Sequence, residues 1–196
     1  MGLIVGHNQS HPFELNLKKA IQAVAFLLKQ NHETNKTDNY MRLLKLLYFA
    51  DRESLKETGR PITGDCFVAM PHGPTLSRLL DLVNQKDVGN IEWDKYIQTE
   101  GYNIRLIQDP GNDKLCRYEI DLLTKIWSQN REKGEWQIAL ESENLPEWKK
   151  NDPGESSKPI SLSDVLEALG NSAWLQDIIE TSAESTRIKH ILKTDC

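Results

Sequence analysis

The stretch YMRLLKLLYFADRESLKET, residues 40–58, constrains the fold more than any other part of this chain. Drawn as a helix, it carries apolar side chains in almost every direction, and a helix of that kind must be surrounded by other elements. Residues 37–39 (Thr-Asp-Asn) are good N-cap residues for its first turn, while Gly59 ends the helix and Pro61 prevents its continuation. The chain is therefore predicted to fold around a buried central helix.

Other helices are predicted where apolar residues recur three and four positions apart. The segments are 17–28, 75–85, 119–130, a separate turn at 135–140, 162–169, and a last helix that contains Trp174 to Ile179. Ser161 and Asp164 resemble a capping arrangement for the helix at 162–169, which Gly170 closes. Residues 147–159 are predicted to form a polar loop.

Two short segments are typical of β-strands. Residues 64–70 contain the β-prone run FVAM between turn-forming residues, and residues 102–108 alternate apolar and polar side chains before a strong turn signal. The two could pair as a small antiparallel ribbon. The predicted class is mainly α (α+β): a compact helical domain around the central helix with a two- or three-stranded antiparallel β-sheet. Residues 13–170 form this domain, and 171–196 form a C-terminal helix and tail packed on it or extending from it.

The charge balance argues against nucleic-acid binding. The 196 residues include 24 Lys and Arg and 29 Asp and Glu, so the net charge of −5 has the wrong sign for gripping phosphates. The last two helices have a spacing similar to a helix-turn-helix motif, but their acidic residues would repel DNA. The sequence leaves open whether the chain forms homodimers.

The hydropathy pattern argues against a membrane protein. The longest apolar runs, at 21–28 and 43–50, fall far short of the roughly 20 residues needed to span a bilayer, and the mean hydropathy is −0.56. The first residues, MGLIVGHNQS, lack the basic segment that begins a secretory signal. A cytoplasmic location is expected.

The sequence contains no motif that predicts a metal or a cofactor. The three cysteines are odd in number and show no CxxC spacing, so they are expected to be reduced thiols. His7 and His11 could share one helical face as metal ligands, but the nearby Pro12 favours a mobile arm. Signatures of phosphate-binding loops, acyl-transfer elbows and zincin helices are also missing from the sequence.

One set of residues could carry catalysis. Asp51, Asp65 and His72 could converge, because the chain turns back between the central helix and the first strand. Each also has a structural explanation, since polar side chains at turns and strand entrances commonly bind backbone groups. The structural interpretation is favoured.

Lys45 interrupts the most apolar stretch of the chain. A lysine ammonium is costly to bury without a partner, so its head either reaches water or is paired. In the second case it lies beside Tyr48 and Arg52 on the same helix and faces a partner.

The continuous stretch from Arg42 to Asp81 resembles the signature of the Panacea domain family, the SocA-like antitoxin domain. It contains LLKLLYFAD, GRPITGD, FVAM and HGP in that order, and several features in one order are more specific than a single short motif. Residues 143–170 are similar to a later block of the family, with a Pro-x-Trp segment and a Pro-Ile lead into a short helix. The resemblance covers roughly 17–170. Relatives often carry a His before Pro-x-Trp, whereas here Ser142 and Glu143 occupy that neighbourhood.

The resemblance implies an antitoxin of a bacterial or phage-encoded toxin–antitoxin pair, without catalytic residues, that binds a cognate toxin encoded by an adjacent gene. Two alternatives remain: an adaptor that delivers the toxin to a host protease, as one relative does, and an enzyme that reverses a toxin-made modification. The predicted partner-binding residues match the motif and are hard to explain as core. They are Lys45, Tyr48, Asp51, Arg52, Arg60, Asp65 and His72.

Two further features bear on partner binding. Trp136 and Trp148 lie in acidic surroundings, and tryptophan is enriched in interface hot spots, although core packing is the simpler explanation for each. The segment 135–147 carries four glutamates and no basic residue, which would suit a basic toxin.

Overall fold

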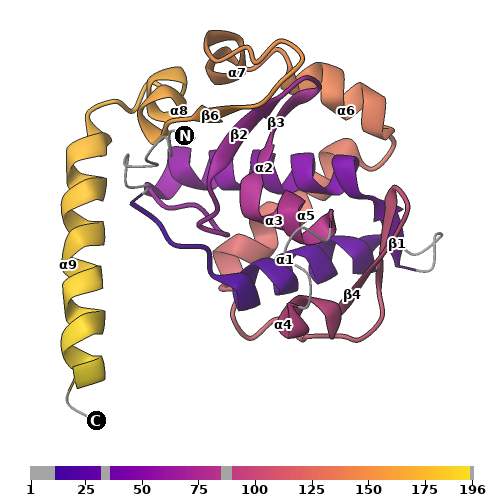
Figure 1. Ribbon diagram of the computed structural model, residues 1–196, viewed down its shortest axis with the longest axis horizontal. Coiled ribbons are helices and arrows are strands. Elements are labelled where there is room, and N and C mark those ends of the chain that lie inside the picture. Colours follow the sequence, from indigo (N-terminus) through magenta and orange to yellow (C-terminus); the bar gives the residue numbers. More distant parts are fainter. Residues whose placement is uncertain (1–11, 32–35, 85–89, 195–196) are drawn as a thin grey trace, which may run out of the picture.

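The computed structural model describes residues 12–31, 36–84 and 90–194, with side chains as far as residue 184. Its central element is helix α2 (Tyr40–Thr58), which lies inside the molecule as predicted (Figure 1). The Asn39 side chain caps its first turn by accepting hydrogen bonds from the amides of Met41 and Arg42, and Gly59 ends it in a left-handed conformation with φ of 72°.

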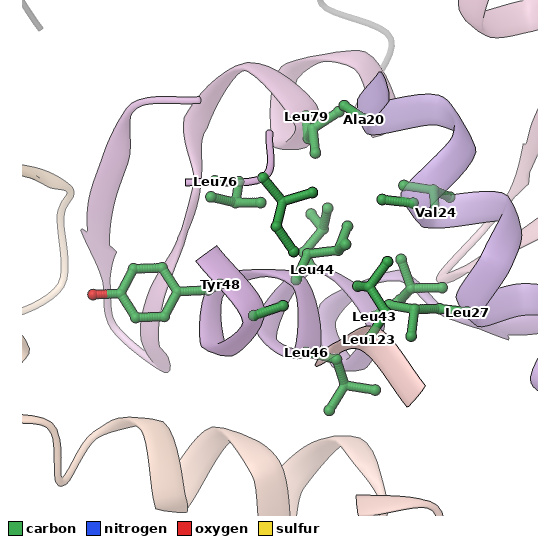
Figure 2. Packing of buried hydrophobic residues seen from close by; sticks show 14 of the residues in the cluster. Ala20, Val24, Leu27, Leu43, Leu44, Leu46, Tyr48, Leu76, Leu79 and Leu123 are labelled. Atoms are coloured by element: carbon green, nitrogen blue, oxygen red, sulfur yellow. The ribbon is translucent and has the colours of Figure 1, made fainter. Parts of the chain in front are cut away.

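Helices α1 (Leu17–Gln30) and α5 (Arg117–Asn130) pack against α2 and supply much of the core. Figure 2 shows Val24 and Leu27 of α1 on the side of α2 that carries Leu43, with Leu123 of α5 close by. Each of these four side chains is fully buried. The apolar residues that surround the α2 axis therefore contact neighbours on several sides, as the sequence pattern requires.

The β-structure of the described residues consists of two three-stranded antiparallel sheets. The first has the order β1 (Thr37–Asn39), β5 (Asn103–Leu106) and β4 (Ile97–Glu100), and the second has the order β3 (Gly73–Leu76), β2 (Phe67–Met70) and β6 (Lys158–Ile160). The class predicted from the sequence, mainly α with a small antiparallel β-sheet, is confirmed, although the structure has two such sheets where the sequence predicted one.

The predicted ribbon between the segments 64–70 and 102–108 is wrong, because these segments belong to different sheets. A tight turn at Pro71 and His72 returns β2 directly onto β3, and the turn at 101–102 likewise pairs β4 with β5. Short connections make neighbouring strands pair locally, and this preference outweighs pairing between distant segments.

The remaining helices differ from the expectation mainly at their boundaries. α3 (Ser77–Val83) begins later than expected because residues 73–76 form β3. The region expected to be a polar loop contains the short helix α7 (Pro146–Lys150) and strand β6. The other elements are α4 (Ile91–Asp94), α6 (Glu135–Ser142), α8 (Leu162–Ala168) and α9 (Trp174–Thr194).

Two predictions at the C-terminal end are confirmed. The Ser161 hydroxyl caps α8 by accepting a hydrogen bond from the Asp164 amide at 3.1 Å. A last helix, α9, begins at Trp174 and runs along one side of the molecule (Figure 1). In the described part of the chain, every helix is too short or too polar to cross a membrane.

Candidate functional site

Asp51 on α2 holds the turn that follows the central helix. Its side chain is fully buried, and its carboxylate accepts hydrogen bonds from the amides of Ile62 at 2.8 Å and Thr63 at 3.0 Å and from the Thr63 hydroxyl. Burial raises the pKa of Asp51 to about 7, whereas these three hydrogen bonds act in the opposite direction. Asp51 therefore fixes the GRPITGD turn (59–65) to α2.

Asp65 closes the same turn and also caps a helix distant in the sequence. It accepts hydrogen bonds from the amides of Cys66 at 2.7 Å, Arg78 at 3.0 Å and Leu79 at 2.9 Å. The last two amides belong to the first turn of α3, whose own N-cap residue, Leu76, provides no side-chain hydrogen bond. Burial raises the pKa of Asp65. The Asp51 and Asp65 carboxylates are thus both committed to backbone groups.

Lys45 lies beneath the HGP turn (72–74). Its side chain is buried, and its Nζ donates a hydrogen bond to the Pro74 carbonyl oxygen at 3.3 Å. Burial lowers the pKa of Lys45 to about 8, and the nearby Glu143 carboxylate opposes this effect. Of the two alternatives predicted for Lys45, an ammonium that reaches water and one that is paired, the structure shows a buried, paired ammonium whose partner is a turn of the second sheet.

Gly73 is the residue that allows this arrangement. Its φ is +92°, and a Cβ atom at this position would overlap the Ser142 hydroxyl and lie 2.9 Å from Lys45 Nζ. Ser142, at the end of α6, is itself buried and donates a hydrogen bond to the Ala139 carbonyl at 2.7 Å. Only glycine fits here without displacing α6, which explains the glycine of the HGP turn.

A second buried carboxylate network ties α7 to α2. The Glu147 side chain accepts hydrogen bonds from the Tyr48 hydroxyl at 3.0 Å and from Arg52 Nε at 2.6 Å. Burial and the Glu147 carboxylate hold the pKa of Tyr48 well above its usual value. The neighbouring Trp148 donates its indole N–H to the Met70 carbonyl at 2.9 Å. The Pro-x-Trp segment (146–148) therefore binds both the central helix and β2.

The predicted partner-binding residues thus fall into a buried and an exposed group. Lys45, Tyr48, Asp51 and Asp65 are buried. Arg52 is half-buried, whereas Arg60 and His72 are exposed. These four buried residues hold turns and helices in place. Their part in partner binding stays a prediction, and it would be indirect, through the shape of the surface above them.

Arg60 and His72 lie in different places on the molecule. Arg60 borders a cavity of about 540 Å³ between the turn after α2 and the first turns of α9, where Trp174 and Ile178 form part of the wall. The exposed ring of His72 packs edge-on against the Trp136 ring of α6, with 5.1 Å between the two ring centroids. The Nδ1 atom of His72 lies 3.9 Å from Glu143 Oε1.

The proposed catalytic set does not assemble as a unit. Thr63 links Asp51 and Asp65, because its hydroxyl donates to the Asp51 carboxylate and accepts from the Asp65 amide. The contacts described for His72 go to Trp136 and Glu143 instead. The two carboxylates therefore serve the fold, and the imidazole belongs to another surface.

No group of three potential metal ligands occurs in the part of the chain that the structure describes. His7 and His11 lie outside the described residues.

The face of α6 around Trp136 contains a residue that sequence reasoning missed. Trp136 is 59% exposed and Leu140, one helical turn later, is 62% exposed. The opposite side of the same helix buries Ile138 and Ala139 against the core. The sequence feature that could have identified Leu140 as a surface neighbour of Trp136 is the spacing of four residues between them, because residues four apart lie on the same side of a helix.

A family model described as "Antitoxin SocA-like, Panacea domain" matches residues 43–149, more than half of the chain. The matched region begins in α2 and ends in α7, so it includes both turns and α6. No curated protein and no solved structure matches the chain.

Proposed function

This chain belongs to the antitoxin SocA-like Panacea domain family, and from that premise we propose that it neutralises a cognate toxin, encoded by an adjacent gene, through direct binding. The family match over residues 43–149 is the observation that carries this proposal. We propose that it acts in the cytoplasm, and that its role depends on a rigid scaffold with an exposed partner surface rather than on catalytic groups.

The state of the buried charges supports a binding role over catalysis. A general acid or base must reach its substrate, but the Asp51 carboxylate is fully buried and occupied by the Ile62 and Thr63 amides. Asp65 is occupied in the same way by amides of α3. Neither carboxylate is available to a substrate, so we propose a non-enzymatic mechanism.

The residues proposed to contact the toxin are the accessible members of the motif: Arg52, Arg60 and His72. The acidic segment 135–147 contributes less charge than its sequence suggests. Glu147 is buried with Arg52, and Glu141 pairs with Lys133 at 2.6 Å. Glu135 and Glu143 remain as carboxylates for a basic partner.

The proposal is tested by expressing the adjacent gene under tight control, alone and together with this chain, while growth is measured. Neutralisation by contact predicts that growth stops with the neighbour alone, recovers on co-expression, and that the two proteins co-purify as a complex. His72→Ala and Arg60→Ala are expected to weaken the complex. Arg117→Ala, which alters an exposed residue of α5, provides the matched control and should leave the complex intact.

The other outcomes separate the competing mechanisms. A neighbour that is not toxic would contradict the antitoxin role for this gene pair. Recovery of growth with loss of the toxin, dependent on a protease gene, would replace simple sequestration with delivery to that protease. Recovery without a complex and without loss of the toxin would favour reversal of a toxin-made modification.

A further inference from the structure

The short helix α6 has two apolar sides, and only one of them is used by the fold. Ile138 and Ala139 face the core and are buried, while Trp136 and Leu140 project into solvent. A surface helix needs one apolar side to hold it in place. The second side therefore contributes little to folding and exposes two large apolar side chains one turn apart.

The exposed side of α6 continues onto the β2–β3 turn. The His72 ring packs edge-on against Trp136, so the imidazole extends the apolar surface beyond the helix. The turn between β2 and β3 and helix α6 lie next to one another along the upper edge of the molecule in Figure 1. We define the α6 face as Trp136, Leu140 and His72.

The support beneath the α6 face makes it rigid. The buried Ser142 bonds to the Ala139 carbonyl within the last turn of α6, and the close approach of Gly73 to Ser142 packs the turn that carries His72 against the end of this helix. Because these supports are buried, the face is already in its binding shape before a partner arrives. Such preorganisation reduces the entropy lost on binding.

The charges around the α6 face favour a basic partner. Glu135 precedes Trp136 and forms none of the ion pairs described for this structure. Glu143 lies 3.9 Å from the exposed His72, and its carboxylate also interacts electrostatically with the buried Lys45 ammonium. The nearest basic residues of the preceding turn are already paired, Arg131 with Glu132 and Lys133 with Glu141. A cation placed over Trp136 would also gain a cation–π interaction.

We propose that the α6 face binds a toxin segment in which an apolar side chain is flanked by lysine or arginine. The apolar side chain packs between Trp136 and Leu140, and the basic side chains reach Glu135 and Glu143. This inference rests on the proposed antitoxin function, because it names the chemistry of the segment that this surface of the antitoxin recognises.

A peptide assay tests the α6 face without the toxin. The probe is a fluorescein-labelled 12-residue peptide of lysine and leucine, compared with the same peptide carrying glutamate in place of lysine, and binding to the full chain is measured by fluorescence anisotropy. The lysine peptide is expected to bind at least tenfold more tightly than the glutamate peptide. The double variant Trp136→Ala, Leu140→Ala is expected to lose at least tenfold in affinity although its charges are unchanged.

Ile91→Ala provides the matched control, because Ile91 is 84% exposed on α4 and truncating it removes apolar surface elsewhere. Its affinity should change by less than twofold. Equal binding of the two peptides, or equal loss in the double variant and in Ile91→Ala, would overturn the inference. Circular dichroism melts of all variants should coincide, since the substituted side chains are exposed.

The growth assay separates this inference from the proposed function. If the wild-type chain and the double variant both rescue growth, the α6 face is not the toxin-binding surface, and the antitoxin function stands. If the double variant fails to rescue and Ile91→Ala succeeds, the inference is supported. If the neighbouring gene is not toxic, the proposed function fails, and the peptide assay alone decides what the α6 face binds.

Discussion

Two regions of this molecule use their polar and aromatic side chains in opposite ways. In the turns after α2, the charged groups of Lys45, Asp51 and Asp65 are buried and bound to backbone atoms. On the α6 face, Trp136 and His72 are exposed, and the contacts described for His72 are with Trp136 and Glu143. The residues that identify the family are therefore mainly those that build the scaffold.

The physical reason lies in the cost of burying charge. A buried carboxylate or ammonium is tolerated only where hydrogen-bond partners replace the lost water, so each such residue needs its partners in fixed positions. A motif made of such residues is restricted by the fold. The exposed Trp136 and Leu140 of α6 carry no comparable restriction, so they can vary without a large loss of stability.

The largest loss of stability is expected for Gly73→Ala. The new Cβ would overlap the Ser142 hydroxyl in a backbone with φ of +92°, so strain and overpacking together should cost about 5 kcal/mol. Gly101→Ala is the matched control, because Gly101 also has a positive φ of 61° but a Cβ added there would meet nothing within 4 Å. The left-handed backbone alone should make Gly101→Ala cost about 1 kcal/mol. Urea unfolding measures both, and equal losses would show that the HGP turn is not held by close packing.

Asp51→Ala is expected to rank second. It leaves the Ile62 and Thr63 amides and the Thr63 hydroxyl buried without their acceptor, which should cost about 4 kcal/mol. Asp121→Ala removes a carboxylate of the same kind from a surface ion pair with Arg117 and should cost less than about 0.5 kcal/mol. Urea unfolding compares the two. A small loss for Asp51→Ala would mean that water can reach the turn.

Lys45 gives the third effect, which depends on pH. The Lys45 pKa is about 8 in the folded chain and near 10.5 in the unfolded chain, so between these values only the unfolded chain holds the proton. The free energy of unfolding should therefore rise with pH in this window, by up to about 3 kcal/mol.

Lys45→Met removes the titrating group and keeps most of the side-chain volume, so this rise should disappear in the variant. Urea unfolding of both proteins from about pH 7.5 to about pH 10.5 measures the difference between the two curves. Parallel curves would show that the Lys45 ammonium keeps its proton when buried, through stronger pairing than its bond to the Pro74 carbonyl provides.

The same contrast explains how much the sequence could predict. Periodicity is local, so the apolar pattern of residues 40–58 was sufficient to predict α2 and its burial. The burial of Asp51 could not be predicted, because its partners at Ile62 and Thr63 reach it only after the chain reverses. An isolated charged residue in a sequence is ordinarily assigned to the surface.

The predictions of strand pairing and of short helices failed for related reasons. The segments 64–70 and 102–108 were correctly predicted as strands, but the sequence pattern of a strand does not specify its partner. Helix α7 has only a few residues, and it is held by tertiary contacts of Glu147 and Trp148 rather than by its own periodicity. The sequence indicates the α6 face only in part, since Trp136 stands out in its acidic surroundings and Leu140 does not.

The smallest effect on stability is expected for Trp136→Ala, and it separates the two regions most directly. Trp136 is 59% exposed, so its truncation should change the free energy of unfolding by less than about 0.5 kcal/mol. Trp93 of α4 is the matched buried tryptophan, with 2% exposure, and Trp93→Ala should cost about 3 to 5 kcal/mol. Thermal and urea unfolding compare the two variants. A large loss for Trp136→Ala would mean that this tryptophan belongs to the core. A small loss together with weakened partner binding would mean that Trp136 serves recognition. A large apolar side chain that is exposed to water adds little to the stability of the fold, and its burial becomes favourable only when a partner covers it.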